Sequence, residues 1–135
     1  MATQIFVNLP VKNLQRSIAF FTALGYTFNL NFTNENATCM VIDDNIFVML
    51  LVEKFFKTFI SKEICDARKN TEVLLALACD NRAQVDEQLA KAVAAGATIP
   101  REPQDLGFMY SQAFEDLDGH IWELFYMEPT AEGQG

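Results

Sequence analysis

The chain has 135 residues, half of them apolar and 12 of them phenylalanine, and a formal net charge of −8. This length and apolar content suit one domain with a substantial core. The acidic charge argues against a nucleic-acid or anionic-membrane partner, because both bind basic patches, and no apolar run approaches the roughly 20 residues that span a bilayer. Three cysteines without CxxC spacing, and an N-terminus without a leader-like pattern, predict a reduced, cytoplasmic protein.

The first part of the chain predicts a strand, a helix and three further strands. Residues 5–11 predict a short apolar strand with Phe6 and Asn8 on one face. Asn13 is placed to cap a helix over residues 14–24, which Gly25 ends. Apolar and alternating segments between polar turns predict three more strands, over residues 26–32, 37–42 and 46–52.

Residues 54–70 break this regularity and predict a linker, with a short amphipathic helical turn around Phe55 and Phe59. The first pattern then recurs. Asp80 or Asn81 is placed to cap a helix over residues 83–95, whose buried side would carry Val85, Leu89 and either Ala92 or Val93. Strands are expected over residues 72–79, 97–100, 110–114 and 121–127, with a loop over 101–109.

The two halves therefore predict a duplicated βαβββ unit. Leu24-Gly25-Tyr26-Thr27-Phe28 aligns with Ala95-Gly96-Ala97-Thr98-Ile99, and Ile46-Phe47-Val48-Met49 aligns with Ile121-Trp122-Glu123-Leu124. We expect an α+β fold in a single domain over residues 1–128. Its parts are unit one at 4–53, the linker at 54–70 and unit two at 71–128, followed by a disordered tail at 129–135.

The closing hairpin holds the most informative residue of the chain. Asp118-Gly119 predicts a two-residue hairpin turn, and a strand follows in which bulky apolar side chains surround Glu123. A carboxylate in such surroundings is costly to bury unless it is paired, protonated or bound to a metal. Glu123 is therefore either a polar anchor or proton acceptor in a cavity, or a carboxylate paired with a neighbouring donor; the sequence leaves both open.

Other candidates have weaker signals. Asn8 is a ligand contact or an amide satisfied by backbone, and Tyr110 lines a cavity mouth or, the favoured interpretation, caps the core. His120, beside the turn, is expected to be solvent-exposed. Arg82, Arg101 and Glu102 are expected to be solvated, and Cys39 and Cys79 to be buried and inert.

Two motifs resemble the vicinal oxygen chelate superfamily, which includes glyoxalase (lactoylglutathione lyase), bleomycin-resistance proteins and extradiol dioxygenases. They are Val11-x-Asn13-Leu14-x-x-Ser17-x-x-Phe20-Phe21-x-x-Leu24-Gly25-Tyr26 and Asp116-x-Asp118-Gly119-His120-x-Trp122-Glu123-Leu124. The resemblance implies a glyoxalase-like fold in which each βαβββ unit curls into a half-barrel, paired units enclose a cavity, and two chains form a homodimer. In the metal-dependent members, side chains from the first and last strands of both units hold a divalent ion that chelates two adjacent substrate oxygens.

In register with these motifs, the positions of the metal ligands are Phe6, Leu74, Val48 (Met49 if the register slips by one) and Glu123, and a shift in the first strand would offer Asn8. Only Glu123 is a strong ligand for a divalent ion. We therefore expect a cofactor-free pocket for a small, partly apolar molecule, lined by Phe6, Asn8, Val48, Leu74, Tyr110, Trp122 and Glu123. The alternatives are a lyase or dioxygenase that uses Zn, Ni, Mn or Fe with Glu123 as one ligand, and a ligand-free domain that acts through its dimer surface.

Overall fold

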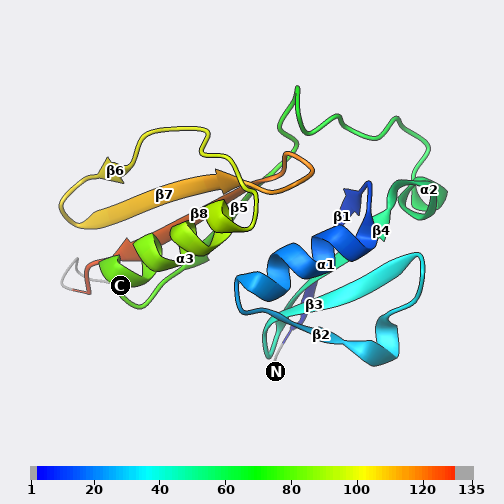
Figure 1. Ribbon diagram of the computed structural model, residues 1–135, viewed down its shortest axis with the longest axis horizontal. Helices are drawn as coiled ribbons and strands as arrows, with labels where there is room; N and C mark the ends of the chain where they lie inside the picture. Colours follow the sequence, from blue (N-terminus) through cyan, green and yellow to red (C-terminus); the bar gives the residue numbers. More distant parts are fainter. Residues whose placement is uncertain (1–2, 130–135) are drawn as a thin grey trace. The chain divides into compact units, whose positions relative to one another are not determined.

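The computed structural model describes residues 3–129, and the chain divides into two compact units, residues 1–65 and 66–135 (Figure 1). The boundary falls inside the predicted linker. Each unit has its own four-stranded mixed sheet. None of the helices within residues 3–129 is long and apolar enough to cross a membrane.

The first unit contains one sheet, one long helix and three short helical segments. Its elements are β1 (Ile5–Val11), α1 (Leu14–Ala23), β2 (Thr27–Asn29), the 3-10 turn η1 (Leu30–Phe32), β3 (Ala37–Asp43), β4 (Ile46–Val52), α2 (Glu53–Phe56) and η2 (Lys57–Phe59). The strand order is β1-β4-β3-β2. β1 runs parallel to β4, whereas the other neighbours are antiparallel.

The second unit repeats this arrangement. Its elements are β5 (Leu74–Ala78), α3 (Arg82–Ala94), β6 (Gln104–Asp105), β7 (Met109–Glu115) and β8 (Ile121–Met127). The order β5-β8-β7-β6, with β5 parallel to β8 and the others antiparallel, matches the first sheet strand for strand. The predicted α+β class and the duplicated βαβββ order are confirmed. That paired units enclose a cavity stays a prediction.

Local capping signals place both long helices where the sequence predicts them. The side-chain oxygen of Asn13 accepts a hydrogen bond from the backbone N–H of Arg16, and that of Asn81 accepts one from Gln84, at 3.0 and 2.8 Å. These bonds satisfy N–H groups that have no partner within the helix. Gly25 and Gly96 follow the helices with φ of 103° and 115°, a left-handed conformation that favours glycine.

Each sheet has one face that packs against its own helix and forms the core of its unit. In the first unit the buried side chains on this face include Met40, Val48 and Leu50, and α1 contributes Phe20 and Phe21. In the second unit Phe114, Trp122 and Leu124 are buried, with Val85, Leu89 and Ala92 of α3. Because strand residues alternate between faces, their sequence neighbours lie on the opposite side. We call that side the far face.

Three predicted elements differ from those observed. The strand expected at 26–32 ends at Asn29, whose side chain accepts a hydrogen bond from the N–H of Asn31 at 3.0 Å and so favours the turn η1. Residues 97–100 form only an isolated bridge, between Thr98 and Glu115, and β6 lies in the expected loop 101–109. The two prolines of this segment, Pro100 and Pro103, have no N–H for a sheet ladder.

The closing hairpin has a longer turn than the two residues predicted. The N–H of Asp116 donates to the carbonyl of His120 at 2.9 Å, so three residues, 117–119, form the turn. Gly119 has a φ of 95°, in the region that favours glycine. In the linker, the predicted helical turn is confirmed as α2 and η2, with Phe55 and Phe59 in edge contact at 5.1 Å. The predicted tail beyond Pro129 lies outside the described residues.

Candidate functional site

Glu123 lies in the middle of β8, on the far face of the second sheet. Its neighbours across the sheet are Ala76 on β5 and Ala113 on β7, whose methyl groups are too short to cover a carboxylate. The side chain is 28% exposed, and its Oε2 atom lies 3.6 Å from Nη2 of Arg101. Of the ways of stabilising this carboxylate that the sequence left open, the structure shows pairing with a cation.

Arg101 reaches this face from the segment between α3 and β6. Its Nη2 donates a hydrogen bond to the hydroxyl of Ser111 at 2.7 Å, and its Nη1 donates one to the carbonyl of Glu102 at 3.0 Å. Ser111 lies on β7 opposite Phe125, and so on the same face as Glu123. The guanidinium is therefore held at two points beside the carboxylate. Our prediction that Arg101 is solvated was wrong.

The carboxylate of Glu123 keeps its capacity to accept hydrogen bonds. The separation of 3.6 Å from Arg101 is an ion-pair distance and exceeds that of a hydrogen bond. Within residues 3–129, no N–H or hydroxyl group donates a hydrogen bond to either oxygen of Glu123. A carboxylate accepts through two oxygens with about four lone-pair sites. The site thus combines a fixed cation with an anion whose oxygens can accept further donors.

Two other predicted site residues, Phe6 and Asn8, lie on the far face of the first sheet. The ring of Phe6 stacks on Phe47 with centroids 4.7 Å apart. The amide of Asn8 donates to the carbonyl of Phe6 on its own strand at 3.2 Å, so the backbone satisfies one of its donors. Asn8 pairs with Met49, which pairs in turn with Cys39. Cys39 is buried, and burial raises the pKa of its thiol, as expected of an inert cysteine.

The register of the two sheets shows which residues correspond. In the first sheet Asn8, Met49 and Cys39 lie side by side on the far face, as Ala76, Glu123 and Ala113 do in the second. Met49 therefore occupies the place of Glu123, which is the one-residue slip that the sequence left open. Val48 is 3% exposed on the face that packs against α1, and we leave it out of the proposed site.

The remaining predicted residues, Leu74, Trp122 and Tyr110, lie on different faces of the second sheet. Leu74 is 53% exposed on the far face, where it pairs with Ile121. Trp122 is 1% exposed on the helix-facing side and stacks parallel to Phe114 at 6.4 Å. Tyr110 faces α3, because its hydroxyl bonds to Asp86 at 2.6 Å. We leave Trp122 and Tyr110 out of the proposed site.

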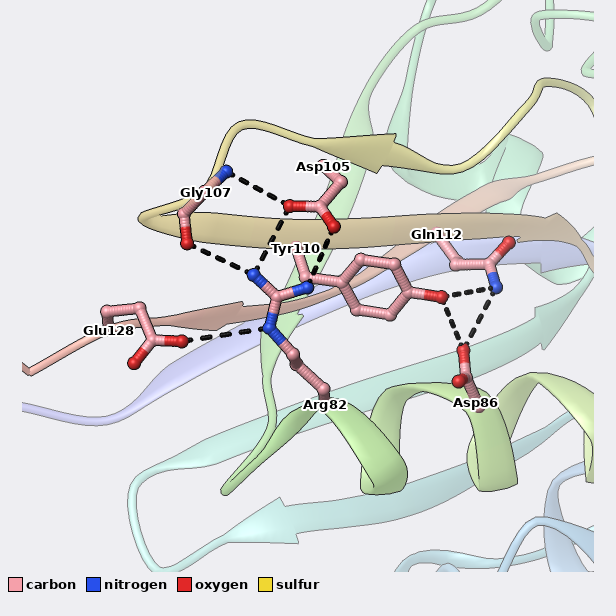
Figure 2. Close-up of polar contacts among 7 residues, drawn as sticks. All are labelled: Arg82, Asp86, Asp105, Gly107, Tyr110, Gln112 and Glu128. Carbon is pink, nitrogen blue, oxygen red and sulfur yellow. Dashed lines mark hydrogen bonds and ion pairs between the residues drawn. The ribbon is translucent and has the colours of Figure 1, made fainter.

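A second polar cluster ties the start of α3 to the β6–β7 turn (Figure 2). Arg82 donates to both carboxylate oxygens of Asp105, at 2.9 and 3.2 Å, and to the carbonyl of Gly107 at 3.0 Å. It also lies 3.7 Å from the carboxylate of Glu128. Its guanidinium is 5.2 Å from the ring centroid of Tyr110. Its side chain is 38% exposed, so Arg82 is solvated as predicted, and its guanidinium also joins three elements of the unit.

The hydrogen bonds of this cluster shift the pKa of its members. The bond from Arg82 lowers the pKa of Asp105 and raises that of Arg82. The bond to Asp86 raises the pKa of Tyr110, and the amide of Gln112 contacts both Asp86 and Tyr110 (Figure 2). These groups bond to one another, so we assign the cluster to the stability of the turn.

The buried carboxylate of Asp116 stabilises the turn of the closing hairpin. It is 5% exposed and accepts hydrogen bonds from the N–H groups of Asp118 and His120 and from the indole of Trp122, at 2.9, 3.0 and 2.9 Å. Burial raises the pKa of Asp116, against the opposing effect of His120 and of these hydrogen bonds. His120 is half-buried, so our prediction of an exposed histidine was wrong. Both residues belong to the frame of the hairpin.

The described residues directly beside Glu123 on the far face of the second sheet add no strong ligand for a divalent ion. Beside Glu123 lie two alanine methyl groups, the cationic Arg101 and a serine hydroxyl that is bound to Arg101. Such ions take several oxygen or nitrogen ligands and are repelled by a neighbouring guanidinium. Within the described residues, no group of three or more His, Cys, Asp and Glu side chains is placed to hold a metal ion.

The sequence and the fold are both similar to those of known proteins. A family model described as bleomycin resistance protein-like N-terminal matches residues 3–43. The fold is similar to that of the hypothetical protein SA1046 from S. aureus, with 27% identity, 93% of this chain and 94% of that chain covered, and a TM-score of 0.78. No curated protein matches the sequence.

Two further solved structures share the fold at lower identity. One is a glyoxalase/bleomycin resistance protein/dioxygenase family enzyme from Burkholderia phytofirmans PsJN, with 16% identity, 93% and 99% coverage of this chain and that chain, and a TM-score of 0.77. The other is a glyoxalase-related enzyme from Fulvimarina pelagi, with 18% identity, 93% and 88% coverage, and a TM-score of 0.79.

The chain therefore has the glyoxalase-like fold of these structures, and its residues 3–43 match a bleomycin resistance protein-like family model. This confirms the fold that the resemblance of the two sequence motifs implied. One fold supports many chemistries, so this fold does not assign an activity. Any activity depends on Glu123 and the residues around it.

Proposed function

We propose that this protein binds a small, partly apolar organic molecule on the far face of its second sheet, without a tightly bound metal ion. The observation that carries the proposal is the state of Glu123. Its carboxylate is only 28% exposed and is paired with Arg101 at 3.6 Å, yet it accepts no hydrogen bond from residues 3–129. A partly exposed carboxylate with unused acceptor sites can accept hydrogen bonds from a ligand in place of water, so a ligand that donates to Glu123 would complete the site.

Apolar side chains around this anchor support an organic ligand. Ile121 and Phe125 lie two residues before and after Glu123 on the same face of β8, and Leu74 and Ala76 continue that face on β5. Binding sites for small molecules are lined mainly by apolar groups, and a few polar groups orient the ligand. In this site Glu123 and Arg101 would supply the orientation, and the neighbouring apolar side chains would supply most of the contact area.

The position of Arg101 argues against a tightly bound metal ion at Glu123. Its guanidinium stands beside Glu123, the carboxylate at the predicted ligand position, and two hydrogen bonds, to Ser111 and Glu102, hold it there. An incoming divalent ion would have to displace this cation and still find further oxygen or nitrogen donors. The alternative, a lyase or dioxygenase that uses Glu123 as one metal ligand, requires that rearrangement.

The binding proposal is tested with a library of small aromatic and aliphatic fragments, followed by backbone-amide NMR of the full chain. We expect shift changes that cluster on β7 and β8 around Glu123, and binding about tenfold weaker in Glu123→Ala, because a hydrogen bond to a charged group contributes roughly 1.5–3 kcal/mol. Glu102→Ala is the matched control, since only the backbone carbonyl of Glu102 contacts Arg101. Equal losses in both variants, or shifts confined to other surfaces, would contradict the proposal.

The same proteins test the alternative by calorimetric titration with Zn²⁺, Ni²⁺, Mn²⁺ and Fe²⁺. Tight, stoichiometric binding of one of these ions that disappears in Glu123→Ala would overturn the metal-free part of the proposal and favour the metal-dependent lyase or dioxygenase. The predicted homodimer, the cytoplasmic location and the lack of nucleic-acid or membrane partners stay predictions.

A further inference from the structure

We infer that the ligand group recognised beside Glu123 is uncharged and carries a hydrogen-bond donor next to an acceptor, as a carboxamide does. The inference rests on the proposed function, because it concerns the same site, and it adds the chemical class of the ligand. On the far face of the second sheet, the fixed guanidinium of Arg101 lies 3.6 Å from the carboxylate of Glu123, which has unused acceptor sites.

The two charges of the site select against charged groups of either sign. An anion attracted to Arg101 would lie against the carboxylate of Glu123, and a cation attracted to Glu123 would lie against the guanidinium of Arg101. The guanidinium cannot lose its proton in a protein, so a cation cannot escape this repulsion through a change of protonation. Placing like charges against each other is a strong source of discrimination in binding sites.

A further carboxylate adds to the penalty for anions. Glu115 lies on the same face of β7, two residues from Ala113, which pairs with Glu123. Its Oε1 accepts a hydrogen bond from the hydroxyl of Thr98 at 3.5 Å. An anionic ligand would thus face two carboxylates along this face, with only one guanidinium to attract it.

The unused hydrogen-bonding capacity of the two residues is complementary. Glu123 can only accept, and residues 3–129 place no donor on it. Arg101 can only donate, and after its bonds to Ser111 and Glu102 it retains further N–H groups. A ligand that satisfies both residues donates to Glu123 and accepts from Arg101. A carboxamide presents an N–H and a C=O in one plane, which matches an adjacent acceptor and donor.

The test uses three probes that share a benzene ring and differ in charge: benzamide, which is neutral, benzoate, which is anionic, and benzamidine, which is cationic. Each is titrated into the full chain while the backbone amides of β7 and β8 are followed by NMR. We expect benzamide to bind at these amides about tenfold more tightly than either charged probe. Benzoate or benzamidine binding there as tightly as benzamide would overturn the inference while leaving the proposed function in place.

Charge variants of the two residues should redirect this preference. Glu123→Gln removes the anion, so benzoate should gain and benzamidine should lose, whereas Glu102→Gln changes the net charge equally and should leave the order of the probes unchanged. Arg101→Gln removes the cation, so benzamidine should gain relative to benzoate. Arg101→Lys, which keeps the charge, is the second variant in case Arg101→Gln does not fold. An order of probes that is the same in Glu123→Gln as in the unmodified chain would also refute the inference. If no probe shifts the amides around Glu123 at any concentration, the proposed function itself fails.

Discussion

Asp116 illustrates at the scale of one residue how the closing hairpin keeps a buried charge. Its carboxylate accepts two backbone N–H groups from the turn and the indole N–H of Trp122, so it joins the turn to the core. Glu123, seven positions later, is partly exposed and has a single cationic partner and no hydrogen-bond donor among residues 3–129. The fold therefore supplies hydrogen-bond donors to Asp116, whereas Glu123 can accept donors from a ligand.

We therefore expect Asp116→Asn to destabilise the protein by about 1–3 kcal/mol, because an amide cannot accept all three bonds without facing one N–H with its own NH₂ group. Urea unfolding, followed through the fluorescence of Trp122, the single tryptophan, measures this change. Asp44→Asn is the control, since Asp44 lies exposed in the β3–β4 turn. A loss in Asp116→Asn no larger than in Asp44→Asn would show that these bonds contribute little.

At the scale of elements, the parts that the sequence predicted are those that local chemistry determines. Asn13 and Asn81 cap their helices within four residues, and alternation alone predicts the burial of Leu124 beside Glu123. The presence of β6, the orientation of Arg101 and the true face of Val48 depend on how distant segments pack. No spacing along the chain reports such contacts, because Arg101 and its partner Glu123 are 22 positions apart.

The cluster around Arg82 holds together α3, the β6–β7 turn and the end of β8 (Figure 2). The bond from Arg82 lowers the pKa of Asp105 below its unfolded value. A lowered folded-state pKa contributes stability above the unfolded pKa of about 3.9, and this contribution is lost as the pH falls through the folded value. The ion pair between Arg82 and Asp105 should therefore weaken only under acidic conditions.

We predict that Arg82→Gln raises the pKa of Asp105 toward its ordinary value, because the variant lacks the cation and the paired donors. Titration of the side-chain carboxyl carbon of Asp105 by NMR measures this pKa directly. The amide of Gly107, which donates to Asp105 at 3.0 Å, should exchange its hydrogen faster in the variant. Lys91→Gln, which removes a charge at the opposite end of α3, should leave both quantities unchanged. An unaltered pKa of Asp105 in Arg82→Gln would show that Arg82 does not control it.

At the scale of the whole molecule, the two units share their strand order and differ in the side chains on their far faces. Both units have the same strand order and the same helix placement. At equivalent places, however, the first unit has Met49 between Asn8 and Cys39, and the second has Glu123 between Ala76 and Ala113. The cores, which determine the fold, retained apolar side chains, whereas the one ion pair on a far face belongs to the second unit among the described residues.

The two units are joined by a segment whose halves differ in how firmly they are held. Residues 66–70 form a turn in which Lys69 and Asn70 donate to the carbonyl of Asp66, and the guanidinium of Arg68 bonds to the carbonyl of Leu117 in the hairpin. Residues 60–65 belong to no helix or strand, and the carbonyl of the exposed Lys62 accepts a hydrogen bond from the flexible ammonium of Lys57. Proteases cut chain segments that can leave the folded surface at little cost.

We predict that brief digestion with trypsin first cuts after Lys62, ahead of Arg68 and Lys69, and yields fragments 1–62 and 63–135 that mass spectrometry identifies. Cuts after Arg82 or Lys91 should come later, because opening α3 exposes the buried side chains of Val85, Leu89 and Ala92. Lys62→Gln should delay the first cut without changing the urea midpoint, which separates loss of the cleavage site from a change in stability. First cuts within α3 would show that the second unit opens more readily than the segment before it and would contradict this prediction.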